Sequence, residues 1–265
     1  MPATAYPTPS PSSQPSTFQS FNLSTFLSLP TFITTEPFAA GQQIQLTEED
    51  AHHIRVRRLD VGTRVALLNG EGLRGTGQLV RLAKKGATVE VATAEQEAPR
   101  GEVHLLLPIA EKDRTLWLAE KATELGVSSW RPVVFRRSKS VASRGEGTMF
   151  TQKVVARMHS AMEQSGNAWM PTVFPEAKVE HAIAAAPPGC RFVLDGAGAP
   201  LAGQLADSCQ SQPIAIVVGP EGGIEDDELE KFVAAGFVKA SIGSTILRFE
   251  TAAVAALGIV QGRMA

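Results

Sequence analysis

The chain has 265 residues, of which 43% are hydrophobic and 20% are charged, and its net charge at pH 7 is −2. This composition is ordinary for one large or two modest globular domains, and no apolar run is long enough for a membrane-spanning helix. Cys190 and Cys209 are too few for a disulfide framework and lack metal-ligand spacing, which fits a reducing cytoplasm. We therefore expect a cytoplasmic protein in which any nucleic-acid surface is a local basic patch.

The first 30 residues are rich in Ser, Thr, Pro and Phe and contain no charged side chain. Such a segment cannot build a hydrophobic core, so residues 1–30 are expected to form a disordered, low-complexity extension. The segment lacks the arginines of a mitochondrial transit peptide and the basic start of a secretory signal.

Residues 31–98 have the pattern of a small all-β domain. Short runs with strand character alternate with glycine-containing turns. The strand-like runs are Gln43–Leu46, Arg64–Leu68, Gly75–Val80 and Thr88–Val91. Strands at this spacing indicate a small barrel. A helix is predicted over Glu48–Leu59, with Thr47 and Asp50 as its N-terminal cap. The run Ala98–Gly101 is the predicted domain boundary.

From residue 102 to the C-terminus, strands alternate with helices. The predicted strands are Val103–Ile109, Trp130–Phe135, Arg191–Leu194, Ile214–Val218 and Val238–Ile242. Helices are predicted over Lys112–Leu125, over Gln152–Ser165, after Glu225 and from Glu250 onward. The last helix is apolar nearly all round, so we expect it to be buried. This alternation predicts an α/β domain with a mostly parallel sheet.

Two glycine turns follow predicted strands of this second domain. Gly219–Gly223 follows one strand and Gly243–Leu247 follows the next, each ahead of a helix. Turns in this position predict a ligand cleft at the carboxyl edge of the sheet, although simple connecting turns would have the same pattern. Neither turn matches a phosphate-binding or dinucleotide-binding motif. Because four acids follow Gly223, a neutral or cationic ligand is favoured over a phosphate.

Basic residues are concentrated in two regions. Eight Lys or Arg residues and two acids lie between His52 and Lys85, and five basic residues with no acid lie between Arg131 and Arg144. This segregation favours a polyanionic partner, although a solvated charged face has the same pattern. His52 and His53 have no clustered Cys or His to complete a metal site, so no metal is expected.

Five sequence motifs, in this order, resemble the bacterial RsmE family of SPOUT-class methyltransferases. They are His52–Leu59, Glu120–Val127, Glu163–Gly166, Gly219–Gly223 and Ile246–Ala252. The last two are the most specific, and the resemblance extends from about residue 31 to the C-terminus. Where the family commonly has an arginine after the third motif, this chain has Asn167.

The resemblance implies a small N-terminal PUA-like β-barrel over residues 31–98 and a trefoil-knotted SPOUT domain over residues 102–265. It also implies a homodimer that uses S-adenosylmethionine to methylate N3 of a uridine in small-subunit (16S) ribosomal RNA. The implied cofactor-binding residues are Leu194, Gly196, Val218, Gly219, Pro220, Glu221, Gly222, Gly223, Ile242, Gly243, Leu247 and Arg248.

Arg248 and Glu250 are the candidate catalytic residues. The N3 proton of uridine must leave before or during methyl transfer, so a base or an oxyanion stabiliser is useful. We expect Arg248 to stabilise the developing oxyanion or to orient the cofactor carboxylate, with Glu250 or Glu221 positioning it. The alternative is an ordinary surface pair in which Glu250 only occupies the first turn of its helix.

The candidate RNA-binding residues are Arg55, Arg57, Arg58, Arg136 and Arg137. Glu163 and Gln164 are either a polar contact at the rim of the site or at a dimer interface, or a solvated pair at a helix end. Two alternatives to the proposed activity stay open. One is a non-catalytic RNA-binding protein on the same scaffold, and the other is methylation of a different RNA position.

Overall fold

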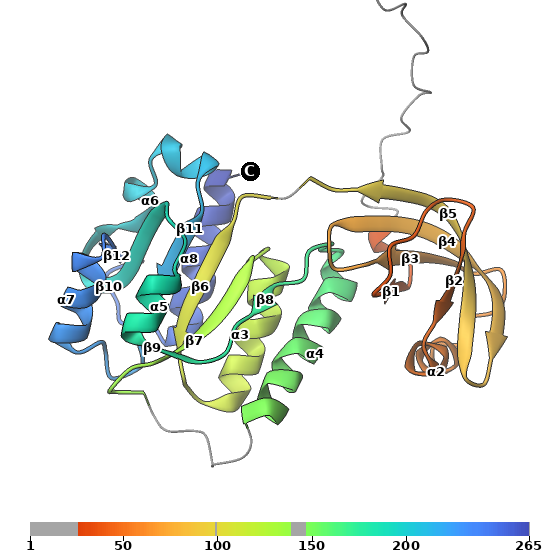
Figure 1. Ribbon diagram of the computed structural model, residues 1–265, viewed down its shortest axis with the longest axis horizontal. Coiled ribbons are helices and arrows are strands. Elements are labelled where there is room, and N and C mark those ends of the chain that lie inside the picture. The colour runs from red at the N-terminus through yellow and green to blue at the C-terminus, as the bar shows by residue number, and fades with distance from the viewer. Residues whose placement is uncertain (1–25, 99, 139–146, 265) are drawn as a thin grey trace, which may run out of the picture.

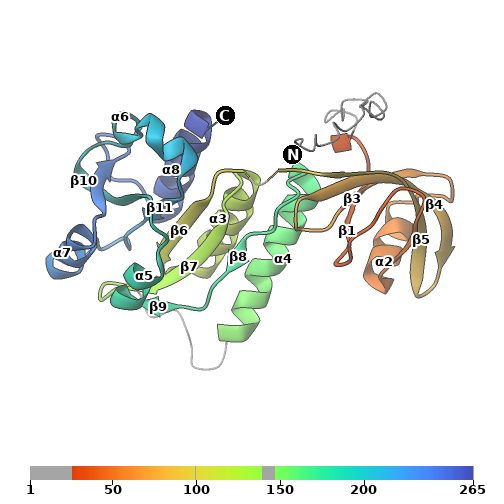
Figure 2. The ribbon, with the colours of Figure 1, turned by 45° about the horizontal axis from the view of Figure 1, so that its top comes forward.

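The computed structural model describes residues 26–98, 100–138 and 147–264. Figure 1 shows a mixed sheet at the N-terminal end of the molecule and a parallel sheet with helices at the other end. Helix α4 (Gly147–Ser165) stands between the two sheets in both ribbon views (Figures 1 and 2). The predicted all-β region followed by an α/β domain is therefore confirmed.

The N-terminal sheet has five strands in the order β1-β3-β4-β5-β2. These are β1 (Thr31–Ile33), β2 (Gln43–Leu46), β3 (Arg64–Leu68), β4 (Leu73–Ala83) and β5 (Gly86–Gln96). Helix α2 (Glu48–Val56) packs Ala51 and Ile54 into the core of this sheet. Its predicted cap is present, because Thr47 and Asp50 form a reciprocal capping box. The helix ends three residues earlier than predicted, at Val56, and Arg58 then adopts a left-handed conformation with φ 55°.

The second sheet has the order β12-β10-β11-β6-β7-β8, with β9 also pairing with β7. Every pairing between these strands is parallel. The strands are β6 (Val103–Pro108), β7 (Ser129–Val134), β8 (Thr172–Val173), β9 (Ala177–Lys178), β10 (Cys190–Pro200), β11 (Ile214–Val217) and β12 (Val238–Ser241). The parallel sheet expected from the alternation of strands and helices is thus confirmed.

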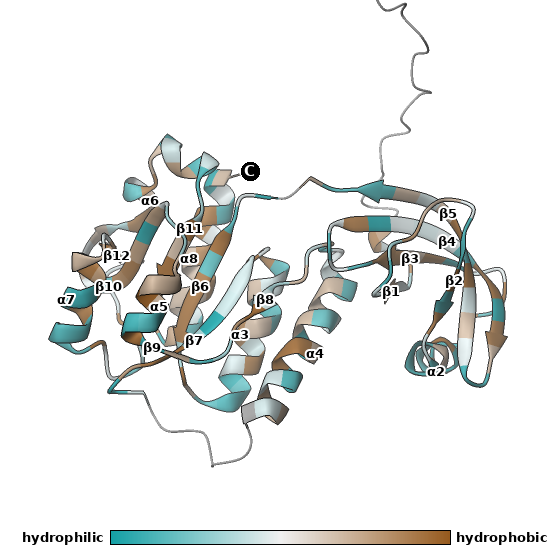
Figure 3. Cartoon of the chain, viewed as in Figure 1, coloured by the Kyte–Doolittle hydropathy of each residue, from teal (hydrophilic) through white to brown (hydrophobic). Residues whose placement is uncertain are grey.

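Helices cover both faces of this sheet. Helices α3 (Lys112–Glu124), α4 and α8 (Phe249–Met264) contribute to the core on one face. Helices α5 (Val179–Ala185) and α7 (Asp226–Ala234) contribute to the core on the other face. Figure 3 shows the apolar residues of β11 and most of β6 running between these layers. Sequence alone did not identify α5, nor the short α6 (Leu201–Gln204) and the 3-10 turn η1 (Asp207–Ser211).

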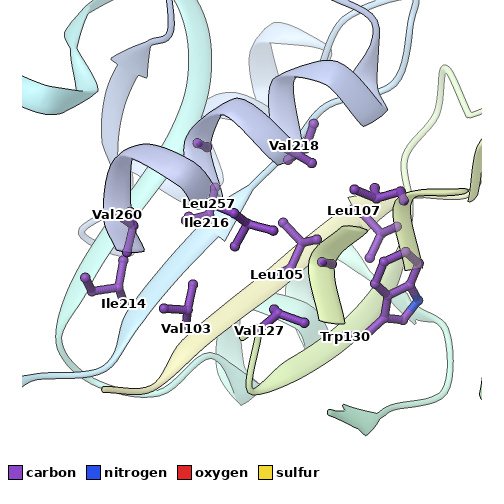
Figure 4. Close-up of a cluster of buried hydrophobic side chains, with 14 of the residues drawn as sticks. Val103, Leu105, Leu107, Val127, Trp130, Ile214, Ile216, Val218, Leu257 and Val260 are labelled. Carbon is purple, nitrogen blue, oxygen red and sulfur yellow. The ribbon is translucent and has the colours of Figure 1, made fainter. Parts of the chain in front are cut away.

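Helix α8 is the central helix of the first layer. Ala253, Ala256, Leu257 and Val260 are fully buried. Figure 4 shows Leu257 and Val260 against Ile214 and Ile216 of β11, with Leu105 and Leu107 of β6 nearby. The predicted burial is thus confirmed for the face of α8 that packs on the sheet, whereas Thr251 and Gly258 are exposed and Val254 and Ile259 are only half-buried.

Two expectations about the chain are corrected. Of the predicted extension, residues 1–25 lie outside the described residues, but Phe26 is only 1% exposed and packs with Ala66, Leu68, Met162 and Ala168. The phenyl ring of Phe26 has a large apolar surface, so its burial is favourable although the segment around it is mostly polar. Cys190 and Cys209, interpreted as giving no disulfide framework, form a disulfide with each other.

The disulfide arises from chain topology that cysteine spacing does not reveal. Cys190 begins β10, and Cys209 lies in η1 just before β11. Because β10 and β11 pair in parallel with Cys190 opposite Ile214, the chain must return to the start of β10 before β11 begins. This return brings the two Cα atoms to 5.7 Å.

Candidate functional site

The two glycine loops lie on either side of the end of β10. Because β10 is between β12 and β11 in the sheet, the loops that follow β11 and β12 emerge at the same carboxyl edge. Strand β10 also shifts register against β12 between Leu194 and Ala199, so the segment around Gly196 bulges from the sheet at this edge. The sheet thus brings together the three segments predicted to hold a cofactor. Sequence predicted β10 only to Leu194 and did not predict the bulge.

The first loop, Gly219–Gly223, is held by the Arg137 side chain and by a backbone hydrogen bond of its own. Gly223 has φ 78°, a conformation that favours glycine, and its N–H donates to the Pro220 carbonyl at 2.8 Å. The guanidinium group of Arg137 donates to the Gly222 carbonyl at 2.8 Å and to both carboxylate oxygens of Glu225 at 2.7 and 2.9 Å. A bidentate contact of this kind fixes orientation as well as distance. The first loop is therefore anchored to the segment after β7.

The second loop, Ile242–Arg248, is open by comparison. A Cβ added at Gly243 would have no atom within 4 Å, and the same holds for Gly196. Ile246 is fully exposed, and the exposed Arg248 side chain makes no hydrogen bond or ion pair with any residue that the structure describes. The backbone at these glycines is thus accessible to a ligand.

Arg114, which sequence analysis missed, connects the two loops. Its Nη1 contacts the Glu221 carboxylate of the first loop, and its Nε lies 3.8 Å from Oε1 of Glu250 at the start of α8. The expected positioning of Arg248 by Glu221 or Glu250 is not present, because both carboxylates face Arg114 instead. A usable signal was the place of Arg114 in the first turn of the helix after β6, since that helix starts at the same sheet edge.

The start of α3 is itself well fixed. Glu111, at the N-cap, accepts the backbone N–H groups of Asp113 and Arg114 at 3.0 Å each. These two hydrogen bonds stabilise the charged form and lower the pKa of the Glu111 carboxyl. The cap holds the backbone from which the Arg114 side chain extends.

A cavity of about 450 Å³ lies where α3 and α8 begin. Its lining residues are Asp113, Arg114, Trp117, Arg248, Glu250 and Thr251. The two candidate catalytic residues therefore share one cavity. The Glu250 side chain is 10% exposed, and its Oε2 is buried with no hydrogen-bond partner within the described part of the chain. A buried carboxylate oxygen without a donor is costly, and functional sites are one place where such groups occur.

The candidate RNA-binding arginines lie in two groups with different surroundings. Arg55, Arg57 and Arg58 are exposed at the end of α2, and Arg55 donates to the carbonyls of Ala83 and Lys84 at 2.9 and 3.3 Å. Arg136 pairs with Asp227 of α7, and Arg137 anchors the first loop. The second group is thus engaged within the protein. Lys139 and Arg144 of the same basic segment lie outside the described residues.

The end of α4 contacts other elements of the chain. Asn167 is buried; its Nδ2 donates to the Thr123 carbonyl at 2.9 Å, and its Oδ1 accepts the Trp169 N–H at 3.1 Å. At this position the side chain joins α3 to the loop after α4.

Burial raises the pKa of the Glu163 carboxyl. His52 and His53 are both exposed.

Within residues 26–98, 100–138 and 147–264, no three His, Cys, Asp or Glu side chains come together as a potential metal site. None of the helices built from these residues has the length and apolar character to cross a membrane.

A family model described as an RNA methyltransferase domain matches residues 96–261, more than half of the chain. This chain belongs to the RNA methyltransferase family. A second family model, described as an RNA methyltransferase PUA domain, matches residues 46–92. The methyltransferase model contains both glycine loops and the cavity, and the PUA model contains α2 and most of the mixed sheet. The α/β fold with a smaller PUA-like domain, inferred from the sequence, is confirmed.

Curated relatives carry the name ribosomal RNA small subunit methyltransferase E. The relative from Synechocystis is 28% identical over 219 residues, covering 81% of this methyltransferase and 71% of the relative. The relative from Mycobacterium tuberculosis is 27% identical over 241 residues, with 86% and 89% of the two chains covered.

Solved structures resemble the whole described fold. The ribosomal RNA small subunit methyltransferase E of Neisseria gonorrhoeae, crystallised bound to S-adenosyl methionine, superposes with a TM-score of 0.81 at 27% identity. The match covers 88% of this chain and 97% of that chain. A structure from Legionella pneumophila superposes with a TM-score of 0.79 at 24% identity over 88% of this chain and 97% of its own, and it supports the fold alone.

Proposed function

We propose that this RNA methyltransferase transfers a methyl group from S-adenosylmethionine to N3 of a uridine in small-subunit (16S) ribosomal RNA. The observation that carries the proposal is the shared cavity of Arg248 and Glu250 beside two glycine loops. The names of the curated relatives support small-subunit ribosomal RNA as the substrate. The bound S-adenosyl methionine of the Neisseria structure supports the cofactor.

The residues at the sheet edge fit this cofactor. Gly196 and Gly243 leave open space where a side chain would stand, and Gly223 has the left-handed backbone of a tight turn. Backbone groups of Leu194–Gly196, Val218–Gly223 and Ile242–Leu247 would hold the adenosine part of the cofactor. Arg248 would lie near the carboxylate of its methionine part or near the reacting base. When bound, S-adenosylmethionine supplies an electrophilic methyl group on a cationic sulfur, which tolerates the nearby Glu221 carboxylate.

We also propose that the domain over residues 102–265 contains the trefoil knot that the resemblance implies.

Glu250 and Arg248 have complementary roles in this proposal. In this proposal the Glu250 carboxylate, which lines the cavity and has one oxygen without a hydrogen-bond donor among the described residues, accepts the N3 proton of uridine. The guanidinium group of Arg248 would stabilise the negative charge that then develops on the adjacent carbonyl oxygens. The charge of Arg114, whose Nε lies 3.8 Å from Oε1 of Glu250, favours the ionised carboxylate that this role requires.

Substrate RNA would be held mainly by the PUA-like domain. We propose a division into a PUA-like domain over residues 31–98 and a SPOUT domain over residues 102–265. Arg55, Arg57 and Arg58 are proposed phosphate contacts because they are exposed on the PUA-like domain. The protein is proposed to be a cytoplasmic homodimer without a bound metal. A subunit interface would cover the fully exposed Ile246.

The test is methyl transfer followed by nucleoside analysis. Purified protein is incubated with isotopically labelled S-adenosylmethionine and either naked small-subunit RNA or 30S particles, and the RNA is digested and analysed by mass spectrometry. The proposal predicts label in 3-methyluridine. Label in another nucleoside would move the reaction to a different RNA position. Tight RNA binding without cofactor binding or label would favour the non-catalytic alternative.

A further inference from the structure

A partly exposed tryptophan lines the proposed catalytic cavity. Trp117 is 44% exposed, whereas Trp130, another of the three tryptophans, is buried at 1%. Trp117 lies three residues after Arg114 on α3, so the two side chains are neighbours on one helix face. Proton transfer by Glu250 and charge stabilisation by Arg248 do not involve Trp117.

We propose that Trp117 is the stacking platform for the uracil ring that receives the methyl group, and that the cavity is the acceptor-base subsite. This inference rests on the proposed function and names the part of the site that selects its substrate. The volume of about 450 Å³ is within the range of small-molecule sites. An aromatic face in such a cavity contributes to binding a base of any sequence, because every base has a π-face.

The polar groups of the cavity supply the selectivity that stacking lacks. Uracil presents its Watson–Crick edge as an N–H donor between two carbonyl acceptors. Glu250 and Arg248 both line the cavity; one oxygen of the Glu250 carboxylate is buried without a donor, and the Arg248 guanidinium group has no acceptor among the described residues. A carboxylate matches the N3–H, and a guanidinium matches an adjacent carbonyl oxygen. Cytosine lacks the N3 proton, so its N3 acceptor would face the acceptor oxygens of the Glu250 carboxylate, a mismatch that disfavours binding.

The test uses variants of Trp117 together with separate measurements of RNA and cofactor. Trp117→Ala is expected to raise the RNA KM by about tenfold or more, as loss of one base-stacking contact predicts. Trp117→Phe should restore most of this affinity, because it keeps an aromatic face. Affinity for S-adenosylmethionine should change by less than about twofold in both variants, since the cofactor is held by the glycine loops. Met149→Ala, a change at an exposed apolar residue outside the cavity, is the matched control.

Fluorescence gives a readout that a structural role would not produce. A short oligouridylate should quench the emission of the wild-type protein, and this quenching should be lost in Trp117→Phe. Oligocytidylate should quench less. This measurement needs no methyl transfer, so it separates failure of the inference from failure of the proposed function, which the nucleoside analysis tests.

Two outcomes would overturn the inference. One is an unchanged RNA KM and unchanged oligouridylate quenching in the Trp117 variants. The other is a shift to a smaller species in sedimentation with loss of cofactor binding in Trp117→Ala, which would assign Trp117 to a subunit interface instead.

Discussion

The two glycine loops differ in how firmly the protein holds them. The loop after β11 is anchored by Arg137 through Gly222 and Glu225 and contacts Arg114 through Glu221. The loop after β12 has open space at Gly243, an exposed Ile246 and an Arg248 without a partner among the described residues. The first loop is thus formed before a ligand binds, whereas the second leaves groups available to a ligand. Preformed positioning together with unused polar groups is the arrangement that a transfer enzyme needs.

The largest expected effect concerns the candidate reacting groups at the end of the second loop and the start of α8. Glu250→Gln and Arg248→Ala should each lower the rate of methyl transfer by about 100-fold or more, because a proton acceptor or an oxyanion donor is lost. The rate is measured in single turnover with saturating cofactor and RNA. Activity within about twofold of wild type in either variant would remove that residue from the catalytic role.

The second prediction concerns the disulfide at the start of β10, which should affect stability but not cofactor binding at the loops. The Cys190–Cys209 bond closes a loop with a sequence separation of 19, so Cys190→Ser should lower the free energy of unfolding by about 3 kcal/mol. Cofactor affinity should not change, because the cysteines are at the opposite end of the strand from the loops. Urea unfolding in oxidising and reducing buffer is the measurement. Identical wild-type stability in both buffers would show that the bond does not contribute.

The third prediction compares a glycine from each loop. Gly243→Val should weaken S-adenosylmethionine binding by about tenfold or more while leaving the unfolding free energy within about 0.5 kcal/mol, because the space around Gly243 is open in the protein alone. Gly223→Val should lower stability as well, by about 1–3 kcal/mol, because its φ of 78° strains a β-branched residue. Calorimetry and urea unfolding are compared for the two variants. Equal losses of stability would contradict the difference between the loops.

The smallest expected effect tests the anchor of the first loop. Arg137→Ala removes the contacts to Gly222 and Glu225 and should weaken cofactor binding about three- to tenfold, the range of one or two partly exposed charge-assisted hydrogen bonds. Arg136→Ala, which breaks an exposed pair with Asp227, is the matched control and should have little effect. If Arg137 instead binds RNA, as its place in a basic segment suggested, the variant would lose RNA affinity and keep its cofactor affinity.

Local signals in the sequence predicted much of the fold. The capping box of Thr47 and Asp50 and the apolar character of α8 depend on residues that are neighbours in the chain, so they could be predicted from the sequence. The bulge in β10 and the Cys190–Cys209 bond depend on strand order, which periodicity does not give. Arg114 was missed for the same reason, since it meets Glu221 from 107 residues away. Of the six residues that line the cavity, Arg248 and Glu250 were among the candidates from the sequence.

Cofactor binding at the glycine loops is tested most directly by calorimetric titration of the purified protein with S-adenosylmethionine, with wild type, Gly243→Val and Glu250→Gln in parallel. We expect saturable binding with one site per chain, weakened in Gly243→Val and nearly unchanged in Glu250→Gln. Absence of saturable binding to a folded wild-type protein would contradict the assignment of these loops to a cofactor. Equal binding by wild type and Gly243→Val would place the cofactor away from the second loop.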